Sequence, residues 1–599
     1  MTFRTLIRRS LRFHWRSHLG VVLGAAIGSA ALIGALVVGD SVKGSLREQA
    51  LSRIGNTHLV LEAGDRLFRS ALANELQSGL QDRNAPAVAV EPALMTVASV
   101  STASGDARVN HVQVIGVTDN FGRLAPRPDN FQPVRADMVG INRTLAAALR
   151  VKTGDTLILR LPKPTALNRE FAVSQKSEAT VALRLTIQTV VEDSALGQFN
   201  LRGSQVAPFN AFVSLQDIQR RLGIAGQANV ILVGGNVPKE EPYRYGSHLR
   251  ASATAGLAGA WQLADTQGFL RAVTNGSFLE LRTARVFLDP QLTEAAQTVS
   301  ADSQGLLTFL VNLFQAKTRA TPYSMVTAAG APWTPAGLRD DEIVVSQWLA
   351  EDLEVKPGDE IALSYFLPES GAKLEEGTNT FRVHSIVPME MPWADRTLMP
   401  DFPGIEKAES TSEWDAGFPL TYEIRKKDDD YWKQHRGTPK AFITLAAGQK
   451  MWGNRFGNLT AIRFPIPGSE SRLQAESPSA ATTAPDRLKA ELQTGEDFRA
   501  ALEKKILANL KPEELGLRFE PVREQALKAA AESQDFGGLF LGFSFFLIIA
   551  ALLLMAMLFQ FGLEQRAPEI GTLLALGFTP GQVRKLLLRE GVALAFIGG

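Results

Sequence analysis

Few residues of this sequence have the types and spacing that catalysis or metal binding would need. Cysteine is absent, which excludes disulfides, thiolate zinc sites, iron–sulfur clusters and thiol nucleophiles. The seven histidines include no His-Glu-x-x-His motif, which argues against a zinc hydrolase, and no Gly-Lys dipeptide occurs, which excludes a P-loop. Asp428, Asp429 and Asp430 lack the alternating spacing and the glycine of a calcium loop, so a solvated turn is predicted there. We therefore expect no catalytic residue, no cofactor and no metal site.

One segment near the C-terminus has the pattern of a docking element. A short helix is predicted to begin at Glu569, where a carboxylate is favourable at the positive helix end. Ile570, Leu573 and Leu574 follow at spacings that place them on one apolar face, and Gly577 can end the helix in the left-handed conformation. Such a helix could insert its apolar face into a groove of a partner protein. The alternative is a plain cytoplasmic hairpin with this face on lipid.

A second helix is predicted directly after this segment. Thr579 as N-cap, Pro580 in the first turn and Gln582 at the third position have the arrangement of a capping box. Phe578 and Val583 fall where a hydrophobic staple would pack.

Two long apolar runs must position these segments relative to a membrane. Leu19–Gly39 is 21 residues without a charge, about 31 Å as a helix, which is enough to span a bilayer. A cleaved signal peptide is the competing reading, but its apolar region is shorter, about 7–15 residues. Phe536–Leu563 is 28 residues long and is predicted to span with a tilt. A third run, Gly591–Gly599, is too short to span, so we expect a truncated sequence with further membrane helices beyond it.

Glycines within the first run indicate where another helix could pack, and charges beside both runs indicate their orientation in the membrane. Gly20, Gly24 and Gly28 repeat every four residues and form a small-residue groove that another helix could approach, although glycine is common in membrane helices generally. Basic residues lie before the first run and after the second. This distribution places both ends in the cytoplasm and the 496 residues 40–535 outside. These basic residues are Arg4, Arg8, Arg9, Arg12, Arg16, Arg566, Arg584, Lys585 and Arg589.

The N-terminal residues 1–18 are predicted to form an amphipathic cytoplasmic helix, with an apolar row at every fourth position and arginines in the adjacent row. His14 and His18 are interpreted as interfacial side chains and not as ligands. Across the whole chain, 63 basic residues balance 62 acidic ones, so nothing indicates nucleic-acid binding.

The 496 residues between the two runs contain an internal repeat. Residues 142–159 and 346–363 share 8 of 18 positions, and each copy runs from a short helix through a Gly-Asp turn into a strand. The turns contain Gly154 with Asp155 and Gly358 with Asp359, and we expect positive φ at both glycines. A second pair of matching segments, 211–215 and 441–445, has a larger offset, so an insertion is predicted near residues 390–437.

These patterns predict a membrane α-helical protein with a large α+β extracytoplasmic region built from two related units. Strands are predicted over 109–117, 186–191 and 382–387, a linker over 234–259 and a mobile loop over 465–485. The predicted segments are a cytoplasmic helix 1–18, membrane helix 19–39, unit 40–235, unit 236–535 with a stalk, membrane helix 536–563, cytoplasmic segment 564–589 and the start of a third membrane helix at 590–599.

The segment Glu564–Gly599 resembles the MacB/FtsX-like family of ABC transporter permeases, through Glu569-Ile-Gly571, Ala575-Leu-Gly577 and the stretch 586–590. The N-terminal arginine helix and the Gly-Asp turns are similar to that family too. The resemblance implies that the short helix is the coupling helix that meets a separate cytoplasmic ATPase. The coupling residues are then Glu569, Ile570, Gly571, Leu573, Leu574, Leu576 and Gly577.

The resemblance also implies a non-enzymatic permease subunit in the bacterial cytoplasmic membrane that passes ATP-driven motion to its outer region. Its expected partners are the ATPase, a second permease copy or paralogue, and a lipoprotein, exported compound or envelope protein. A two-helix sensory receptor with an outer ligand domain is the alternative, although a sensor would continue into a signalling coiled coil or kinase. An anchored extracytoplasmic enzyme fits less well, because no Gly-x-Ser-x-Gly or metal motif occurs.

Overall fold

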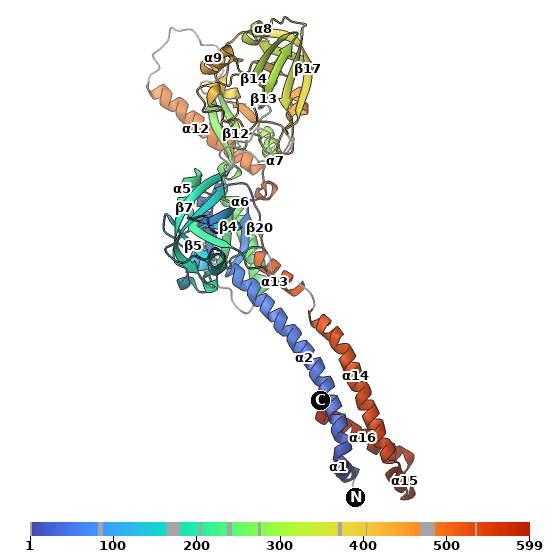
Figure 1. The fold of residues 1–599 in the computed structure, drawn as a ribbon. Coiled ribbons are helices and arrows are strands. Elements are labelled where there is room, and N and C mark those ends of the chain that lie inside the picture. The colour runs from blue at the N-terminus through green and yellow to red at the C-terminus, as the bar shows by residue number, and fades with distance from the viewer. Residues whose placement is uncertain are drawn as a thin grey trace. The chain divides into compact units, whose positions relative to one another are not determined.

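The fold is taken from a computed structural model, which describes residues 3–81, 88–164, 180–202, 206–235, 242–273, 277–368, 374–402, 404–467, 485–532 and 536–598. Contacts divide the chain into two compact units (Figure 1). The helical unit comprises Met1–Ile54, Asn200–Gln205 and Arg523–Gly599. The sheet unit comprises Gly55–Phe199 and Val206–Val522.

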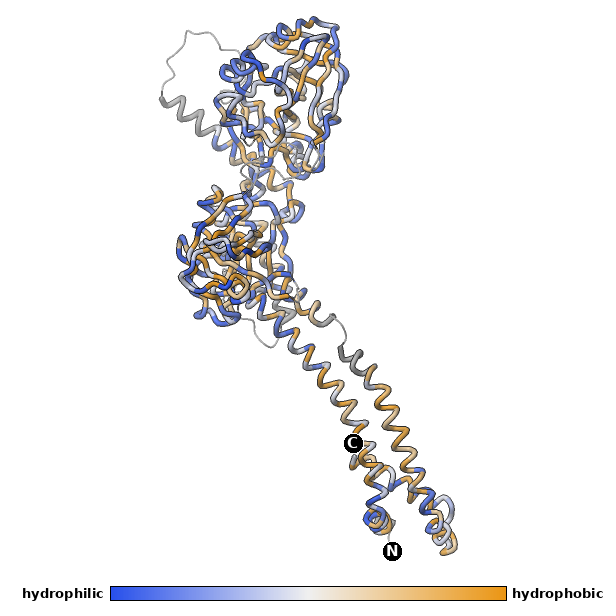
Figure 2. Tube along the Cα trace, viewed as in Figure 1, coloured by the Kyte–Doolittle hydropathy of each residue, from blue (hydrophilic) through white to orange (hydrophobic). Residues whose placement is uncertain are grey.

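The helical unit contains the two predicted apolar runs. Its helices are α1 (Phe3–Phe13), α2 (Trp15–Ile54), α13 (Val522–Glu532), α14 (Phe536–Gln565), α15 (Ala567–Ala575) and α16 (Pro580–Gly598). Among the described residues, Trp15–Ile54 and Gly542–Gln565 are long and apolar enough to cross a membrane. Figure 2 shows hydrophobic colouring along most of the described part of α14, whereas α2 carries hydrophilic as well as hydrophobic colouring.

Two helices in this unit have other bounds than the predicted segments. The N-terminal helix ends at Phe13, and α2 begins at Trp15, so residues 1–18 are not one helix. The helix of the first run does not end at Gly39 but continues for another 15 residues to Ile54. Residues 40–54 contain no proline and several strong helix formers, so nothing there stops the helix.

Helix α14, which contains the second run, packs against the glycines of the first run in α2. A Cβ at Gly20 would lie 3.1 Å from the Leu558 side chain, and one at Gly24 would lie 3.4 Å from Cβ of Met555. The groove predicted from glycine spacing is therefore occupied by α14, which runs beside α2 (Figure 1).

The first sheet has nine described strands. In spatial order they are β20 (Phe519–Glu520), β1 (Thr57–Glu62), β10 (Val230–Gly235), β3 (Val88–Thr102), β4 (Arg108–Val117), β8 (Asn210–Ser214), β5 (Met138–Asn142), β7 (Thr180–Val191) and β6 (Thr156–Pro162). Its helices are α3 (Ala71–Gln81), α4 (Arg143–Leu149), α5 (Leu215–Leu222) and α6 (Pro242–Ala260).

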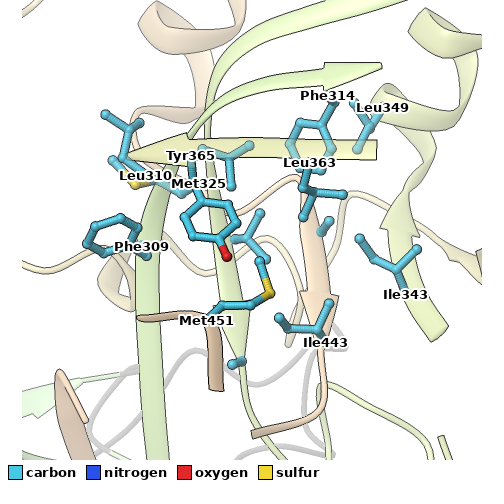
Figure 3. Packing of buried hydrophobic residues seen from close by; sticks show 14 of the residues in the cluster. Phe309, Leu310, Phe314, Met325, Ile343, Leu349, Leu363, Tyr365, Ile443 and Met451 are labelled. Carbon is cyan, nitrogen blue, oxygen red and sulfur yellow. The ribbon is translucent and has the colours of Figure 1, made fainter. Parts of the chain in front are cut away.

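The second sheet also has nine described strands. In spatial order they are β11 (Gly268–Val273), β12 (Phe278–Thr283), β19 (Ala461–Pro465), β13 (Gln304–Ala316), β14 (Arg319–Ala328), β18 (Ala441–Ile443), β15 (Glu342–Ser346), β17 (Glu376–Val387) and β16 (Glu360–Phe366). Its helices are α7 (Pro290–Gln297), α8 (Gln347–Leu353), α9 (Lys426–His435), α10 (Leu445–Trp452) and α12 (Pro485–Ala508). Figure 3 shows part of its core, where Phe309, Leu363 and Met451 pack together.

Each sheet has eight strands after the first one in its spatial order. When these eight strands are ranked by their order along the chain, the ranks follow one another in space identically in the two sheets. The parallel pairs also correspond, since β4 lies parallel to β8 as β14 does to β18. The predicted strands over 109–117, 186–191 and 382–387 lie in β4, β7 and β17.

The two predicted Gly-Asp turns have the same local structure. Gly154 has φ +94° and Gly358 has φ +96°, so the left-handed backbone expected at both is present. Their amides donate to Ile187 O at 2.9 Å and to Val383 O at 2.7 Å, which ties each turn to the adjacent strand. In each turn the carboxylate of Asp155 or Asp359 accepts from the backbone amide three residues earlier, at 2.8 Å and 2.9 Å.

The boundary predicted at residues 235 and 236 does not separate the sheets completely. Strand β20 pairs with β1 of the first sheet, with Val60 opposite Glu520, although it lies near the end of the predicted second unit. The predicted linker 234–259 largely forms helix α6, in which Leu249 and Leu257 are buried. Most of the mobile loop predicted over 465–485 lies outside the described residues.

The acidic run Asp428–Asp430 is not a solvated turn but lies in helix α9. Asp428 is buried and caps the helix start together with Arg425, with a 2.7 Å bond between their side chains. Arg425 also reaches Asp352 of α8 at 2.6 Å, so these charges connect the two helices. The sequence did not reveal this, because Asp352 lies far away along the chain.

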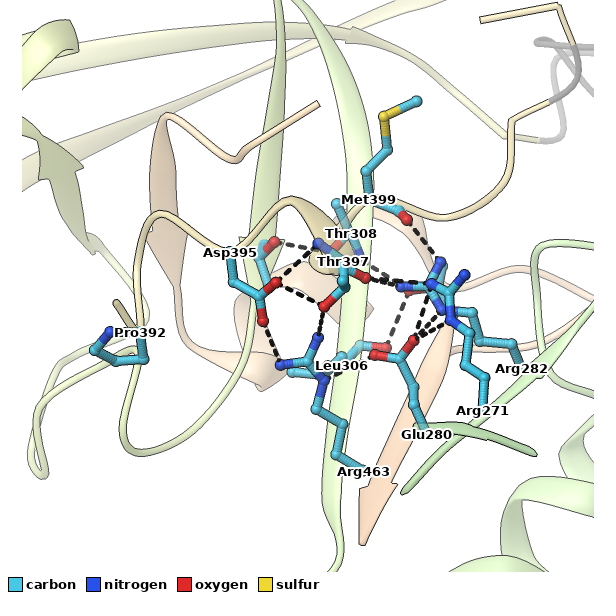
Figure 4. Close-up of polar contacts among 12 residues, drawn as sticks. Arg271, Glu280, Arg282, Leu306, Thr308, Pro392, Asp395, Thr397, Met399 and Arg463 are labelled. Atoms are coloured by element: carbon cyan, nitrogen blue, oxygen red, sulfur yellow. Dashed lines mark hydrogen bonds and ion pairs between the residues drawn. The ribbon is translucent and has the colours of Figure 1, made fainter. Parts of the chain in front are cut away.

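A buried charge network joins the second sheet to the segment 395–399 (Figure 4). Glu280 on β12 accepts from Arg463 of β19 at 2.8 Å, from Arg271 of β11 at 3.1 Å, and also from Arg282. Arg463 continues to the Asp395 carboxylate at 2.9 Å. Arg282, Arg463 and Glu280 are at most 2% exposed, so their charges are balanced by partners within the network and not by solvent.

A buried lysine near α9 makes stability of the second sheet depend on pH. Lys440 Nζ lies 4.0 Å from the ring centroid of Trp348 and 4.5 Å from that of Tyr431. These rings attract a cation. Burial nevertheless lowers the pKa of Lys440 to about 7, although the negative charges of Asp428 and Asp352 act to raise it.

We predict that the free energy of unfolding rises with pH between about 7 and 10.5 because of Lys440. In this range the unfolded lysine, with its ordinary pKa of 10.5, holds a proton that the folded lysine has lost. The gain is at most about 1.4 kcal/mol per pH unit. Unfolding of the full chain, followed by tryptophan fluorescence, should show this rise in the wild type and not in Lys440→Met. Equal pH profiles for the two proteins would contradict the prediction.

Candidate functional site

Helix α15 of the helical unit carries the predicted docking residues. It runs over Ala567–Ala575, two residues earlier than predicted at its start, because Pro568 fits the first turn of a helix. Gly577 has φ +93°, so it does end this region in the left-handed conformation. Gly571 faces open space, since a Cβ there would meet no atom within 4 Å.

The apolar side chains of this region do not all point the same way. Ile570 and Leu574 line an apolar cavity of about 310 Å³ formed with residues of α14 and α16. The other lining residues are Phe559, Leu563, Pro580, Val583, Arg584, Leu587 and Leu588. Leu573 is half-buried, whereas Leu574 is 41% and Leu576 is 72% exposed. The predicted face is therefore partly turned onto the chain's own helices, and Leu576 is the most exposed apolar side chain of the segment.

The N-terminal cap of α16 lies next to this cavity. The Thr579 hydroxyl accepts from the Gln582 amide at 3.3 Å, and the Gln582 side chain accepts from the Thr579 amide at 3.0 Å. This reciprocal pair is the predicted capping box. Val583, one turn further, is buried and lines the cavity.

Charged residues connect α15 to the N-terminal helices. Glu569 lies 3.0 Å from His14, which stands between α1 and α2, and 3.3 Å from Arg566. Arg566 donates to the Ser10 hydroxyl of α1 at 2.7 Å and to Glu590 of α16 at 2.7 Å. Glu590 is 1% exposed, so this ion pair is buried on the α16 side.

The sequence prediction missed this connection. His14 contacts a carboxylate of α15 instead of acting only as an interfacial side chain, and His18 is buried. A signal existed for Glu590, because an acid beside an apolar run requires a partner when it is buried. No signal existed for the pairing of His14 with Glu569, which are 555 residues apart.

The remaining predicted positions have no part in this site. Gly154, Asp155, Gly358 and Asp359 belong to the sheet unit, where they form the two turns described above. Within the part of the chain that the structure describes, no three His, Asp or Glu residues are grouped so that they could hold a metal ion.

Two family models match the chain at its two ends. The MacB-like periplasmic core domain matches residues 19–237, and the FtsX-like permease C-terminal domain matches residues 541–599. The resemblance to the MacB/FtsX-like family is confirmed. A search of solved structures gives the crystal structure of the periplasmic region of MacB from Actinobacillus actinomycetemcomitans, with 10% identity and a TM-score of 0.22, covering 36% of this chain and 88% of that one. No curated protein matches the sequence.

The FtsX-like match contains α15, α16 and most of α14, and so all the predicted coupling residues. The MacB-like match contains most of α2 and the first sheet except β20. The second sheet lies outside both matches. The MacB/FtsX-like family consists of inner-membrane permease components of ABC transporters with a periplasmic domain, and the two candidate spans and the large α+β region fit that role.

Proposed function

We propose that this chain is the permease subunit of an ABC transporter, in which a separate cytoplasmic ATPase docks on α15 and drives conformational change in the outer region. The observation that carries the proposal is the short helix α15 inside the FtsX-like match, which is followed by the exposed Leu576 and by Gly577 in the left-handed conformation. A second permease copy or paralogue completes the transporter, and the outer region acts on lipoproteins, exported compounds or envelope partners.

The contacts of α15 provide a route for motion within the helical unit. Glu569 contacts His14, which lies directly before α2, and Arg566 contacts Ser10 of α1. These two contacts link α15 to the region where α1 leads into α2. Helix α2 then continues without interruption to Ile54, and β1 of the first sheet begins three residues later, at Thr57. A displacement of α15 by an ATPase would therefore be passed along α2 as well as along α14.

We also propose that the two sheets are related copies of one unit. The support is the common order of eight strands and the equal geometry of the turns at Gly154 and Gly358. Helix α6 then belongs to the first copy and not to a linker, and the strand β20 returns to the first copy before α13 begins.

Docking of a cytoplasmic ATPase requires α15 to lie on the cytoplasmic side. Because the chain has no cysteine, single cysteines at Ser104, Asp302 and Thr572 can be labelled specifically; all three positions are exposed. An impermeant thiol reagent added outside spheroplasts of cells with the full chain should label the first two and spare Thr572→Cys until the membrane is opened. Labelling of Thr572→Cys alone would overturn the orientation and the docking proposal with it.

A further inference from the structure

The apolar cavity between α14, α15 and α16 lies at one end of a candidate membrane span. Phe559 lines it from near the end of α14, within the segment Gly542–Gln565 that is long and apolar enough to cross a membrane. From the cavity, α16 returns beside α2, where a Cβ at Gly598 would lie 2.8 Å from Cβ of Ala25. The cavity is therefore placed where the hydrocarbon of a bilayer gives way to the headgroups.

The surface of α16 changes from polar to apolar at Arg584, which is exposed and lines this cavity. Before it lie Thr579 and Gln582, the polar residues of the helix cap. After it, every fourth residue is an exposed apolar side chain, namely Leu588, Val592 and Phe596. Residues four apart share one face of a helix. Arg584 thus stands at the polar end of an apolar row, the level at which basic side chains meet lipid phosphates.

The lining of the cavity combines a single cation with apolar side chains. Of its nine residues, Arg584 alone is charged or polar. Within the described part of the chain, no ion pair or hydrogen bond occupies its guanidinium, whereas Arg566 is paired with Glu590 at 2.7 Å. Such a lining fits a molecule that has both a hydrocarbon chain and an anionic group. Phosphate suits this position, because a guanidinium binds it through two parallel hydrogen bonds.

The size of the cavity fits one hydrocarbon chain. Its volume of about 310 Å³ is at the lower end of the range for small-ligand pockets, about 300–1,000 Å³. It is too small for a helix of another protein, which measures about 10–12 Å across with its side chains. Leu574 and Leu588 line it and are both exposed, so a chain can enter from outside. A lipid with two chains can place one in the cavity and the other along the apolar row of α16.

Further basic side chains near the cavity favour an anionic lipid. Lys585 is exposed next to Arg584. Helix α1, which contacts α16, exposes Arg8, Arg9 and Arg12. Clusters of basic residues beside a membrane span attract anionic headgroups more strongly than zwitterionic ones.

We infer that this cavity binds an anionic phospholipid, with one hydrocarbon chain between α14, α15 and α16 and the phosphate on Arg584. A bound chain would contact Ile570 and Leu574 and so hold α15 against the two longer helices. The inference goes beyond the proposed function and does not depend on it, because headgroups border both faces of a bilayer.

The test uses the full chain in detergent and native mass spectrometry, which counts bound molecules of phosphatidylglycerol or phosphatidylcholine with the same two oleoyl chains. Leu588→Trp fills the cavity from its exposed side. Ile597→Trp is the matched control, because Ile597 is also exposed on α16 but lies on the opposite face. Arg584→Gln removes the cation of the cavity, and Lys585→Gln removes the neighbouring cation that does not line it. Unfolding temperatures establish that the variants fold like the wild type.

The wild type should bind one phosphatidylglycerol about fivefold more tightly than phosphatidylcholine. Leu588→Trp should weaken the binding of both lipids by about tenfold, because the chain loses its apolar contacts, and Ile597→Trp should not. Arg584→Gln should abolish the preference for phosphatidylglycerol, whereas Lys585→Gln should retain most of it.

Equal lipid binding by the wild type and Leu588→Trp would overturn the inference, since the lipid would then bind elsewhere. An equal loss of preference in Arg584→Gln and Lys585→Gln would also overturn it, because the basic surface as a whole would then attract the headgroup. The same holds if the wild type shows no preference, or if equimolar palmitate displaces the phospholipid. A loss of ATPase association with unchanged lipid binding would contradict only the proposed function.

Discussion

Replacing Leu576 with aspartate is expected to abolish association of the full chain with its ATPase while leaving the fold intact. The side chain is 72% exposed, so the change removes little packing within the chain. In a docked complex the new carboxylate would be buried in an apolar groove without a partner, at a cost of several kcal/mol. A loss of 3 kcal/mol corresponds to a factor of about 100 in affinity. Co-purification and stimulated ATP hydrolysis measure the effect.

Lys585→Glu is the matched control for this prediction. Lys585 is exposed on α16 and does not line the apolar cavity, so a reversed charge there should affect association much less. If Leu576→Asp binds and stimulates the ATPase like the wild type, α15 is not the docking element and the sensory-receptor alternative gains support. Leu573→Asp is the less informative variant, because Leu573 is half-buried and the change would also disturb the chain's own packing.

The second large effect is expected from Glu280→Gln in the second sheet. The change removes the carboxylate that Arg271, Arg282 and Arg463 share. The buried Arg282 and Arg463 then keep only part of the negative charge that balances them. Breaking a buried ion pair in this way destabilises a protein by about 3–5 kcal/mol. Thermal unfolding of the full chain should therefore show a clearly lower transition for the second sheet.

Asp401→Asn provides the comparison within the same network. Asp401 is 45% exposed and lies 3.6 Å from Arg271 and 3.9 Å from Arg282, so it is a peripheral, solvent-screened member. Its loss should cost less than about 1 kcal/mol. Similar stability losses in the two variants would show that Glu280 is not the central partner that the structure indicates.

Local features were predictable from the sequence because their causes lie within a few residues. The turns at Gly154 and Gly358 follow from glycine at a left-handed position, and the cap of α16 follows from Thr579 and Gln582. A groove on the glycine face of α2 was predictable for the same reason, from the spacing of Gly20 and Gly24, but the sequence did not identify α14 as the helix that occupies it.

Features that depend on distant residues could not be predicted from one sequence. The acidic run of α9 has the pattern of a solvated turn until Asp352 and Arg425 are brought together. The return of β20 to the first sheet involves a strand of two residues, too short for any pattern. In the candidate site, the direction of Ile570 and Leu574 depends on α14 and α16, so the apolar face of α15 was identified but its surroundings were not.

The continuity of α2 makes this helix a lever. Forty residues of uninterrupted α-helix are about 60 Å long, whereas the hydrocarbon core of a bilayer is about 30 Å thick. A tilt of about 5° around one end displaces the other by about 5 Å, because the arm is so long. A break in the helix at the end of the apolar run would absorb such a tilt at the membrane surface. With the helix intact, a small rotation at the His14 end reaches the Ile54 end as a movement larger than the spacing of two β-strands, about 4.8 Å.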